Sequence, residues 1–313
     1  MAVAFTFPGQ GSQAVGMGKA LAENFPEARA VFEEVDEALA SKLSAIMWEG
    51  PAETLTLTEN AQPALMAVSM AAVRVIEARG VDIKTKVAFV AGHSLGEYSA
   101  LAAAGTLEVA DAARLLRIRG RAMQEAVPVG VGAMAALIGL DFATASEIAR
   151  AAADGEVCDV ANDNGAGQVV VSGNKAAVER AVEIAKTRGA KRAILLPVSA
   201  PFHCALMAPA ARVMDEALSS VTLRAPVVPV VANVLAAPIS DPQEIHRRLV
   251  EQVTSMVRWR ESIAWLSGAG VSLFVEIGAG KVLSGLAKRI AEGSETLTVG
   301  APDDIDAATA RLA

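Results

Sequence analysis

An apolar strand that leads directly into a serine between two glycines is the feature that most constrains the fold. Residues Val87–Ala91 are all apolar, Gly92-His93-Ser94-Leu95-Gly96 follows, and an alanine-rich helical stretch continues to about Ala104. A strand that is apolar on both faces is typical of a parallel sheet with helices on both sides, because each face has to be buried. The sequence therefore predicts an α/β fold built on a parallel sheet.

Segments near the two ends of the chain extend this pattern. Ala2–Phe7 predicts a buried strand that ends in the turn Pro8-Gly9-Gln10-Gly11. Helical spacing predicts a helix over Gln62–Arg79, with Pro63 near its first position, where a missing N–H does no harm. Leu273–Ile277 is predicted to be the last strand of the chain.

The middle of the chain has a different order of elements. It predicts strands over Gly132–Leu140, Val157–Ala161, Gln168–Ser172 and Ala193–Pro197, and helices over Phe142–Ala153 and Lys175–Arg188. The resulting βαββαβ order is that of a ferredoxin-like unit. We therefore expect residues 127–198 to form a small inserted subdomain, and residues 1–126 and 199–313 to form the α/β core.

Composition and spacing exclude several classes of protein. The 313 residues carry a formal net charge of −7, whereas a nucleic-acid binder needs a basic surface to neutralise phosphates. The two cysteines, Cys158 and Cys204, favour a reducing compartment. Neither the cysteines nor the three histidines have the spacing of a metal site such as zinc.

The sequence shows neither a secretory signal pattern nor a membrane-spanning pattern. No basic segment precedes the apolar residues of the N-terminus. Uncharged stretches such as Ala126–Leu140 are too short, or too rich in glycine and proline, to cross a bilayer. We therefore expect a cytoplasmic protein that binds neither nucleic acid nor a membrane.

Ser94 has the surroundings of a nucleophile. Gly92-x-Ser94-x-Gly96 fits the nucleophile-elbow pattern, in which a sharp turn from strand to helix lifts the serine hydroxyl above the sheet. The N-terminus of the next helix points its free N–H groups at the same place, so the N–H of Leu95 is a candidate oxyanion donor. The alternative is a structural turn in which the serine only caps the helix.

A serine hydroxyl needs a base to become a nucleophile. His93 is adjacent to Ser94 and points away from it on a tight turn, and His246 lies in a polar stretch beside two arginines. His203 follows a predicted strand, where open α/β sheets place their sites, and is the best candidate. The order of residues leaves three possible acids as the third member: Asp215, Asp241 and Glu276. A backbone carbonyl or amide oxygen can hold the imidazole equally well.

An ordered set of short motifs runs nearly from end to end of the chain. The motifs are Phe7–Gln13 (FPGQGSQ), Thr58–Pro63 (TENAQP), Gly92–Tyr98 (GHSLGEY), Arg119-Gly120, Gln168–Gly173 (QVVVSG), Pro201–Cys204 (PFHC), Gln252 with Trp259, and Glu276–Gly278 (EIG). Together they resemble the malonyl-CoA:acyl-carrier-protein transacylases of fatty acid synthesis. The resemblance implies an α/β-hydrolase-like core with a ferredoxin-like insertion.

The resemblance also implies catalytic roles for the matching residues. Ser94 would be the acyl-accepting nucleophile and His203 its base. The backbone carbonyl of Gln252 would orient the histidine in place of an acid. The backbone N–H groups of Gln10 and Leu95 would form the oxyanion hole.

Three further residues would contact the acyl group. The helix expected over Leu107–Ala126 carries four arginines, and only the resemblance assigns the malonyl carboxylate to Arg119, whose planar guanidinium suits it. Buried and unpaired without substrate, Arg119 would favour malonyl over neutral acetyl. Phe202 would limit the room for an α-methyl group, or it packs in the core. Asn162, like Asn164, would line the acyl pocket or cap a turn.

The expected function is therefore transfer of malonyl from malonyl-CoA to acyl carrier protein through a malonyl-serine, without a metal or prosthetic group. We expect a monomer. Because carrier proteins are acidic, a basic rim should meet them; the candidates are Lys191, Arg192, Arg258, Arg260, Lys281, Lys288 and Arg289. The alternatives are a serine esterase or thioesterase, a non-catalytic carrier-binding subunit, and an acyltransferase of polyketide synthesis.

Overall fold

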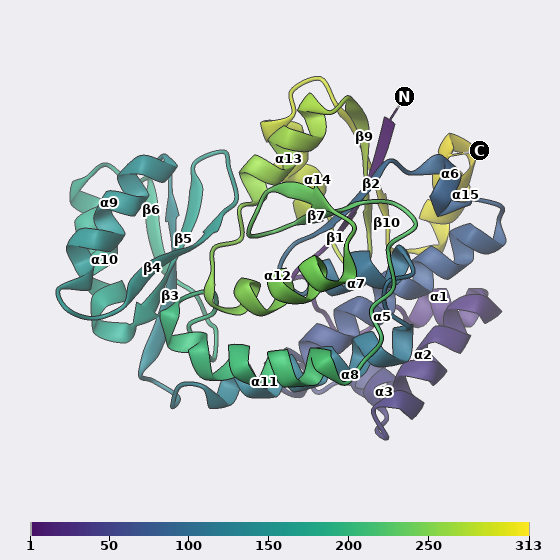
Figure 1. Ribbon diagram of the computed structural model, residues 1–313, viewed down its shortest axis with the longest axis horizontal. Helices are drawn as coiled ribbons and strands as arrows, with labels where there is room; N and C mark the ends of the chain where they lie inside the picture. Colours follow the sequence, from purple (N-terminus) through teal and green to yellow (C-terminus); the bar gives the residue numbers. More distant parts are fainter. Residues whose placement is uncertain (1, 313) are drawn as a thin grey trace.

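The computed structural model describes residues 2–312, which contain a parallel sheet and a separate antiparallel sheet (Figure 1). The larger sheet has the strand order β10-β9-β1-β2-β7-β8; all neighbours are parallel except β8, which is antiparallel to β7. Its strands are β1 Ala2–Phe7, β2 Phe89–Gly92, β7 Val230–Ala232, β8 Ala237–Ile239, β9 Val271–Ile277 and β10 Glu295–Val299. The predicted parallel sheet is confirmed.

Helices bury both faces of the larger sheet. Along β1, Phe5 and Phe7 enter the main core with α2, α5, α7 and α8, whereas Ala4, which precedes Phe5, packs with α13 and α14 on the other face. The helices of this unit are α1 Lys19–Asn24, α2 Pro26–Ala38, α3 Leu43–Glu49, α4 Ala52–Thr56, α5 Thr58–Ala78, α6 Ile83–Lys86, α7 Gly96–Ala103, α8 Val109–Glu125, α11 Ala208–Ser219, α12 Pro242–Thr254, α13 Trp259–Gly268, α14 Val282–Ile290 and α15 Pro302–Leu312, with the 3₁₀ helix η1 at Ala205–Met207. This burial explains why its central strands carry apolar residues on both faces.

The smaller sheet lies with α9 and α10 at one end of the molecule (Figure 1). Its elements follow the predicted βαββαβ order: β3 Gly132–Ile138, α9 Phe142–Ala153, β4 Cys158–Asp163, β5 Gln168–Asn174, α10 Lys175–Thr187 and β6 Arg192–Leu195. The strands are antiparallel in the spatial order β4-β5-β3-β6. On one face Ala135 and Leu137 pack with α9 and α10, while Met134 and Ala136 on the other face join the main core.

The start of α5 differs from the prediction. This helix begins at Thr58, so Pro63 lies inside it and not at its first position. Its first turn is held by groups that do not need the proline N–H. The carbonyl of Leu57 accepts hydrogen bonds from the N–H groups of Asn60 and Ala61 at 2.8 Å each, and Asn60 Nδ2 donates to the Thr54 carbonyl at 2.8 Å.

The prediction that Leu273–Ile277 is the last strand is wrong. β10 pairs with β9 in parallel and forms one edge of the sheet, and α15 follows it. In β10 only Val299 is buried, so this edge strand lacks the continuous apolar run that identified the central strands. The short strand β8 at the opposite edge was also not predicted; it has three residues and contains Pro238.

One described helix, α5, is long and apolar enough to cross a membrane by length and composition alone. It lies inside the molecule, where 83% of its most apolar window is buried. Its composition is accounted for by its contacts with α2, α7 and α8 in the main core.

The close contact between α7 and β1 predicts a contrast between two helical glycines. A Cβ on Gly96 would lie 2.2 Å from the backbone oxygen of Phe7, whereas a Cβ on Gly285 in α14 meets nothing within 4 Å. We expect Gly96→Ala to lower the free energy of unfolding by about 2–4 kcal/mol, and Gly285→Ala to raise it by about 0.5–1 kcal/mol. Urea unfolding of both variants measures the difference, and equal midpoints would contradict the predicted contact.

Candidate active site

Ser94 lies on a strained turn between β2 and α7, at the C-terminal edge of the parallel sheet. Its φ is 53°, in the left-handed region that is costly for a residue with a Cβ. The glycines on either side are required by contact. A Cβ on Gly92 would lie 1.8 Å from the backbone oxygen of Gly96, and a Cβ on Gly96 would meet the carbonyl of Phe7. The local sequence pattern is therefore what allows the turn to form.

Asn233, which directly follows β7, holds this turn through its side chain. Its Oδ1 accepts the Ser94 N–H at 2.8 Å, and its Nδ2 donates to the Gly92 carbonyl at 2.7 Å. Its own N–H donates to the buried carboxyl of Glu97 at 3.1 Å. The sequence analysis did not single out Asn233 or Glu97. Two signals could have identified them: a polar residue at the end of a strand, and one acid in an alanine-rich helix.

The structure brings Ser94, His203 and Gln252 together. The Ser94 Oγ lies 2.7 Å from His203 Nε2, and His203 Nδ1 lies 2.9 Å from the backbone carbonyl oxygen of Gln252. Because a carbonyl can only accept, Nδ1 carries the proton and Nε2 is left to accept from the serine hydroxyl. His203 also has a left-handed backbone, with φ 58°.

The three possible acids lie in other contacts. Asp215 pairs with His246 at 2.7 Å. Asp241 caps α12 by accepting the N–H of Glu244, and Glu276 accepts the first N–H groups of α14. The group that accepts from His203 Nδ1, where a triad would have an acid, is the Gln252 carbonyl.

Arg119, on α8, reaches the same serine. Its Nη2 donates to Ser94 Oγ at 3.1 Å and to Gln252 Oε1 at 2.8 Å, and its Nη1 donates to Gln62 Oε1 at 2.7 Å. The side chain is 1% exposed and lies over the ring of Tyr98. Arg119 is buried, as expected, and no ion pair among the described residues includes it; its hydrogen bonds go to two amide oxygens and a hydroxyl.

The other arginines of α8 point elsewhere. Arg114 pairs with Asp111 at 3.0 Å, and Arg121 pairs with Glu59 at 2.6 Å. Arg117 is half-buried and makes no hydrogen bond to Ser94 within the described part of the chain. Arg119 is therefore the arginine of α8 that contacts Ser94.

Gln10 and Leu95 line the same pocket as Ser94. Within residues 2–312, neither backbone N–H donates a hydrogen bond, so both are available to an oxygen in the pocket. The turn that carries Gln10 packs tightly on the elbow, because a Cβ on Gly9 would lie 2.9 Å from the carbonyl oxygen of His93. A glycine is required at this close approach.

The pocket has a volume of about 420 Å³ and contains the predicted acyl-contacting residues Phe202 and Asn162. Phe202 is 9% exposed; it lines the pocket and also packs in the main core. Asn164 does not line the pocket; its Oδ1 lies 2.9 Å from His93 Nε2. This contact joins the small sheet's loop to the elbow.

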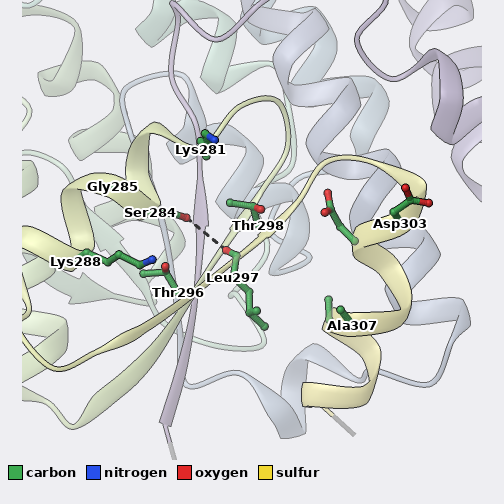
Figure 2. Close-up of a pocket in the computed structure, with 11 residues that line it drawn as sticks. Lys281, Ser284, Gly285, Lys288, Thr296, Leu297, Thr298, Asp303 and Ala307 are labelled. Atoms are coloured by element: carbon green, nitrogen blue, oxygen red, sulfur yellow. Dashed lines mark hydrogen bonds between the residues drawn. The ribbon is translucent and has the colours of Figure 1, made fainter.

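Figure 2 shows a second pocket, of about 530 Å³, between α14, β10 and α15. It is larger than the first, but it contains none of the predicted catalytic residues. Two of its polar residues serve the fold: Ser284 Oγ donates to the Leu297 carbonyl, and Asp304 caps α15 by accepting the N–H groups of Gly300 and Ala301. The candidate catalytic residues Ser94 and His203 line the first pocket.

Burial and charge set the protonation states in the Ser94 pocket. Burial first, and then the positive charge of Arg119, lower the pKa of His203 to about 3. Burial raises the pKa of Glu97 to about 7, although hydrogen bonds from Gln252 and Asn233 oppose this. His203 is therefore neutral near pH 7 and can act as a base.

The chain is similar to known acyl transferases over nearly its whole length. A family model described as "acyl transferase domain" matches residues 4–301. A malonyl CoA-acyl carrier protein transacylase of Bacillus subtilis (strain 168) is 47% identical over 311 residues, which cover 99% of this chain and 97% of that protein. The chain belongs to the family of malonyl-CoA:acyl-carrier-protein transacylases.

Solved structures agree in fold over the whole chain. The crystal structure of an acyl-carrier-protein S-malonyltransferase from Bartonella henselae is 62% identical, covers 100% of this chain and 99% of its own, and has a TM-score of 0.98. A second match comes from the structure of a type II polyketide-synthase acyl-carrier protein in complex with its malonyl-transacylase. The matched chain is 41% identical, the alignment covers 99% of this chain and 100% of that one, and the TM-score is 0.96.

The charge of Arg119 predicts a measurable shift in the titration of His203. We expect Arg119→Met to raise the pKa of His203, because it removes a nearby positive charge, although burial keeps that pKa below its ordinary value. The rate at which a fluorophosphonate labels Ser94 reports the neutral histidine. In the pH profile of this labelling rate, the acidic limb should lie at higher pH for Arg119→Met than for the wild type.

The matched control for this measurement is Arg121→Met. Arg121 lies on the same helix and pairs with Glu59 at the surface. Its loss should leave the acidic limb in place. An unchanged or lower limb in Arg119→Met would show that the arginine does not act on the histidine.

Proposed function

We propose that this protein transfers a malonyl group from malonyl-CoA to the phosphopantetheine thiol of an acyl carrier protein, through a malonyl ester on Ser94, and so supplies fatty acid chain extension. One observation carries the proposal. The Ser94 hydroxyl lies between the neutral nitrogen of His203 at 2.7 Å and the cationic Arg119 at 3.1 Å. A nucleophile, its base and a carboxylate-binding cation thus converge on one oxygen.

In the first half-reaction, Ser94 Oγ attacks the thioester carbon while its proton passes to His203 Nε2. The Gln252 carbonyl stabilises the resulting imidazolium, because it accepts a hydrogen bond from the Nδ1–H group. The negative oxygen of the tetrahedral intermediate accepts hydrogen bonds from the N–H groups of Gln10 and Leu95. The carbon–sulfur bond then breaks, and the CoA sulfur leaves with the proton from His203.

In the second half-reaction, the carrier's thiol attacks the malonyl ester. His203 takes the thiol proton and returns it to Ser94 Oγ as the carbon–oxygen bond breaks. Water would compete with the thiol. Arg119 helps to exclude this reaction by fixing the acyl group through its carboxylate, away from a line of attack for water.

The remaining pocket residues select the acyl group. Arg119 binds the malonyl carboxylate through its planar fork of N–H groups. Phe202 restricts the room beside the α-carbon, where an added methyl group changes binding by only about 1–3 kcal/mol. Asn162 supplies a polar side chain on the wall contributed by the small sheet.

We also propose the finer description of the fold. Residues 1–126 and 199–313 form an α/β-hydrolase-like core, which the glycine-flanked serine on a strand-to-helix turn supports. Residues 127–198 form a ferredoxin-like insertion, which the βαββαβ order and the spatial order β4-β5-β3-β6 support. The protein acts in the cytoplasm as a monomer and uses no prosthetic group of its own.

The carrier protein is the proposed macromolecular partner, and a basic rim is the proposed docking region. Two of the seven predicted basic residues are engaged in ion pairs, since Arg258 pairs with Glu261 and Arg260 pairs with Asp163 at 2.7 Å. Among the described residues, five have no ion pair: Lys191, Arg192, Lys281, Lys288 and Arg289. These five are the better candidates to meet an acidic carrier.

A freestanding acyltransferase of polyketide synthesis is the second candidate function. The observation in its favour is the structural relative whose partner is a type II polyketide-synthase carrier protein. The two functions share the same chemistry at Ser94 and differ in the carrier that accepts malonyl. Transfer rates to fatty-acid and polyketide carriers, measured side by side, separate them.

Intact-protein mass spectrometry tests the proposed chemistry. After mixing with malonyl-CoA alone, we expect one malonyl adduct per chain, which holo carrier protein then removes. Ser94→Ala should give no adduct, because the accepting oxygen is gone. Acetyl-CoA and methylmalonyl-CoA should give much weaker adducts.

Two other outcomes would contradict the transferase. Continued release of CoA without a lasting adduct would identify a thioesterase. Neither adduct nor CoA release would identify a non-catalytic carrier-binding protein.

A further inference from the structure

Arg119 is a buried cation that is held by neutral groups. Its two side-chain acceptors other than the serine are the amide oxygens of Gln62 at 2.7 Å and Gln252 at 2.8 Å. None of the ion pairs among the described residues includes Arg119. A buried arginine is normally neutralised by a carboxylate, because leaving its charge uncompensated is costly.

Gln62 reaches Arg119 because α5 and α8 approach closely. A Cβ on Gly120 would lie 2.5 Å from the Cα of Glu59, so the residue after Arg119 has to be a glycine. This contact brings the first turns of α5 against α8. Gln62 is 1% exposed and lines the pocket beside the guanidinium.

The orientation of the Gln62 amide follows from its neighbours. Its Nε2 lies 3.8 Å from the sulfur of Met123, a weak acceptor, and its Oε1 accepts from the guanidinium. A flipped amide would place N–H donors against N–H donors. Gln62 therefore presents an acceptor that orients Arg119 and carries no charge.

The nearest acid is kept away from Arg119 by the second amide. Gln252 Oε1 accepts from Arg119, while its Nε2 donates to Glu97 Oε2 at 2.8 Å. The N–H of Asn233 donates to the same carboxyl oxygen. Burial also raises the pKa of Glu97 to about 7, which weakens its negative charge near neutral pH. The charge of Arg119 thus stays available to a ligand.

We propose that Gln62 is a specificity-determining residue: its neutral amide orients Arg119 without neutralising it, so that the charge is left for the carboxylate of the acyl group. This inference rests on the proposed function, because it assumes that a carboxylated acyl group is the substrate. It assigns the preference for malonyl over acetyl to a residue that contacts the arginine and need not touch the substrate.

The inference predicts the effect of an isosteric change of charge. In Gln62→Glu, the new carboxylate has the same shape and accepts from Arg119 Nη1, but it forms an ion pair that neutralises the guanidinium. We expect kcat/KM for malonyl-CoA to fall by about 100-fold or more, mainly through KM. The value for acetyl-CoA should fall much less, because acetyl has no carboxylate to be repelled.

Two companion variants separate charge from packing. Gln62→Met removes the acceptor and adds no charge, so we expect a selective fall for malonyl-CoA of only about 10-fold. Gln124→Glu makes the same chemical change on α8, where Gln124 Nε2 donates to the Ser199 carbonyl and does not contact Arg119. Its malonyl-to-acetyl ratio should stay within about 3-fold of the wild type.

The outcomes distinguish this inference from the proposed function. If the wild type forms no malonyl adduct, the proposed function fails. The wild type can instead be loaded while Gln62→Glu lowers kcat/KM for malonyl-CoA and for acetyl-CoA by the same factor. In that case Gln62 has only a structural role, and the inference is overturned. Should Gln62→Glu not fold, as judged by its melting temperature, Gln62→Met decides: an unchanged ratio overturns the inference, and a selective loss of malonyl activity supports it.

Discussion

The left-handed backbone of Ser94 is the constraint on which the rest of the site depends. A side chain in this conformation is strained, and it persists only where surrounding contacts fix it. Here the glycine contacts with β1 and the two hydrogen bonds of Asn233 supply that support. The turn joins the end of β2 to the start of α7, and Asn233, which follows the neighbouring strand β7, holds it. Regular secondary structure therefore positions the hydroxyl.

Around this turn the protein maintains a polar network in an apolar interior. Gln252 contributes three groups to it: its carbonyl orients His203, its amide oxygen accepts from Arg119, and its amide nitrogen donates to Glu97. A partly satisfied network would cost more than an apolar core. The cost left here is that of a cation without a carboxylate, which also lowers the pKa of His203. In the proposed mechanism the same charge serves selectivity and, together with burial, keeps His203 unprotonated.

The sequence predicted the parts of this arrangement that are encoded locally. The strand, the glycines and Ser94 form one continuous pattern. His203 was predicted because it follows a strand, but that strand, β6, pairs with β3 in the antiparallel sheet and does not belong to the parallel sheet on which the prediction relied. Arg119 and the carbonyl of Gln252 could not be derived from spacing, since four arginines share one helix and a backbone carbonyl leaves no mark in a sequence; the family resemblance supplied both. Asn233 was missed because its bonds to the elbow join residues 139 and 141 positions apart. The edge strand β10 was missed because only one of its residues is buried.

The small sheet and the base share one support, which ties the shape of the pocket to its chemistry. A few residues after Gln252, the backbone of Val257 exchanges hydrogen bonds with β4: its N–H donates to the Ala161 carbonyl at 2.9 Å, and its carbonyl accepts from Asp163 at 3.0 Å. Asn162, between these two residues, lines the pocket. Arg260 reinforces the junction through Asp163. One short segment, from Gln252 to Val257, thus contacts both His203 and the strand that carries Asn162. In the proposed mechanism, the position of the base is therefore tied to that of the pocket wall.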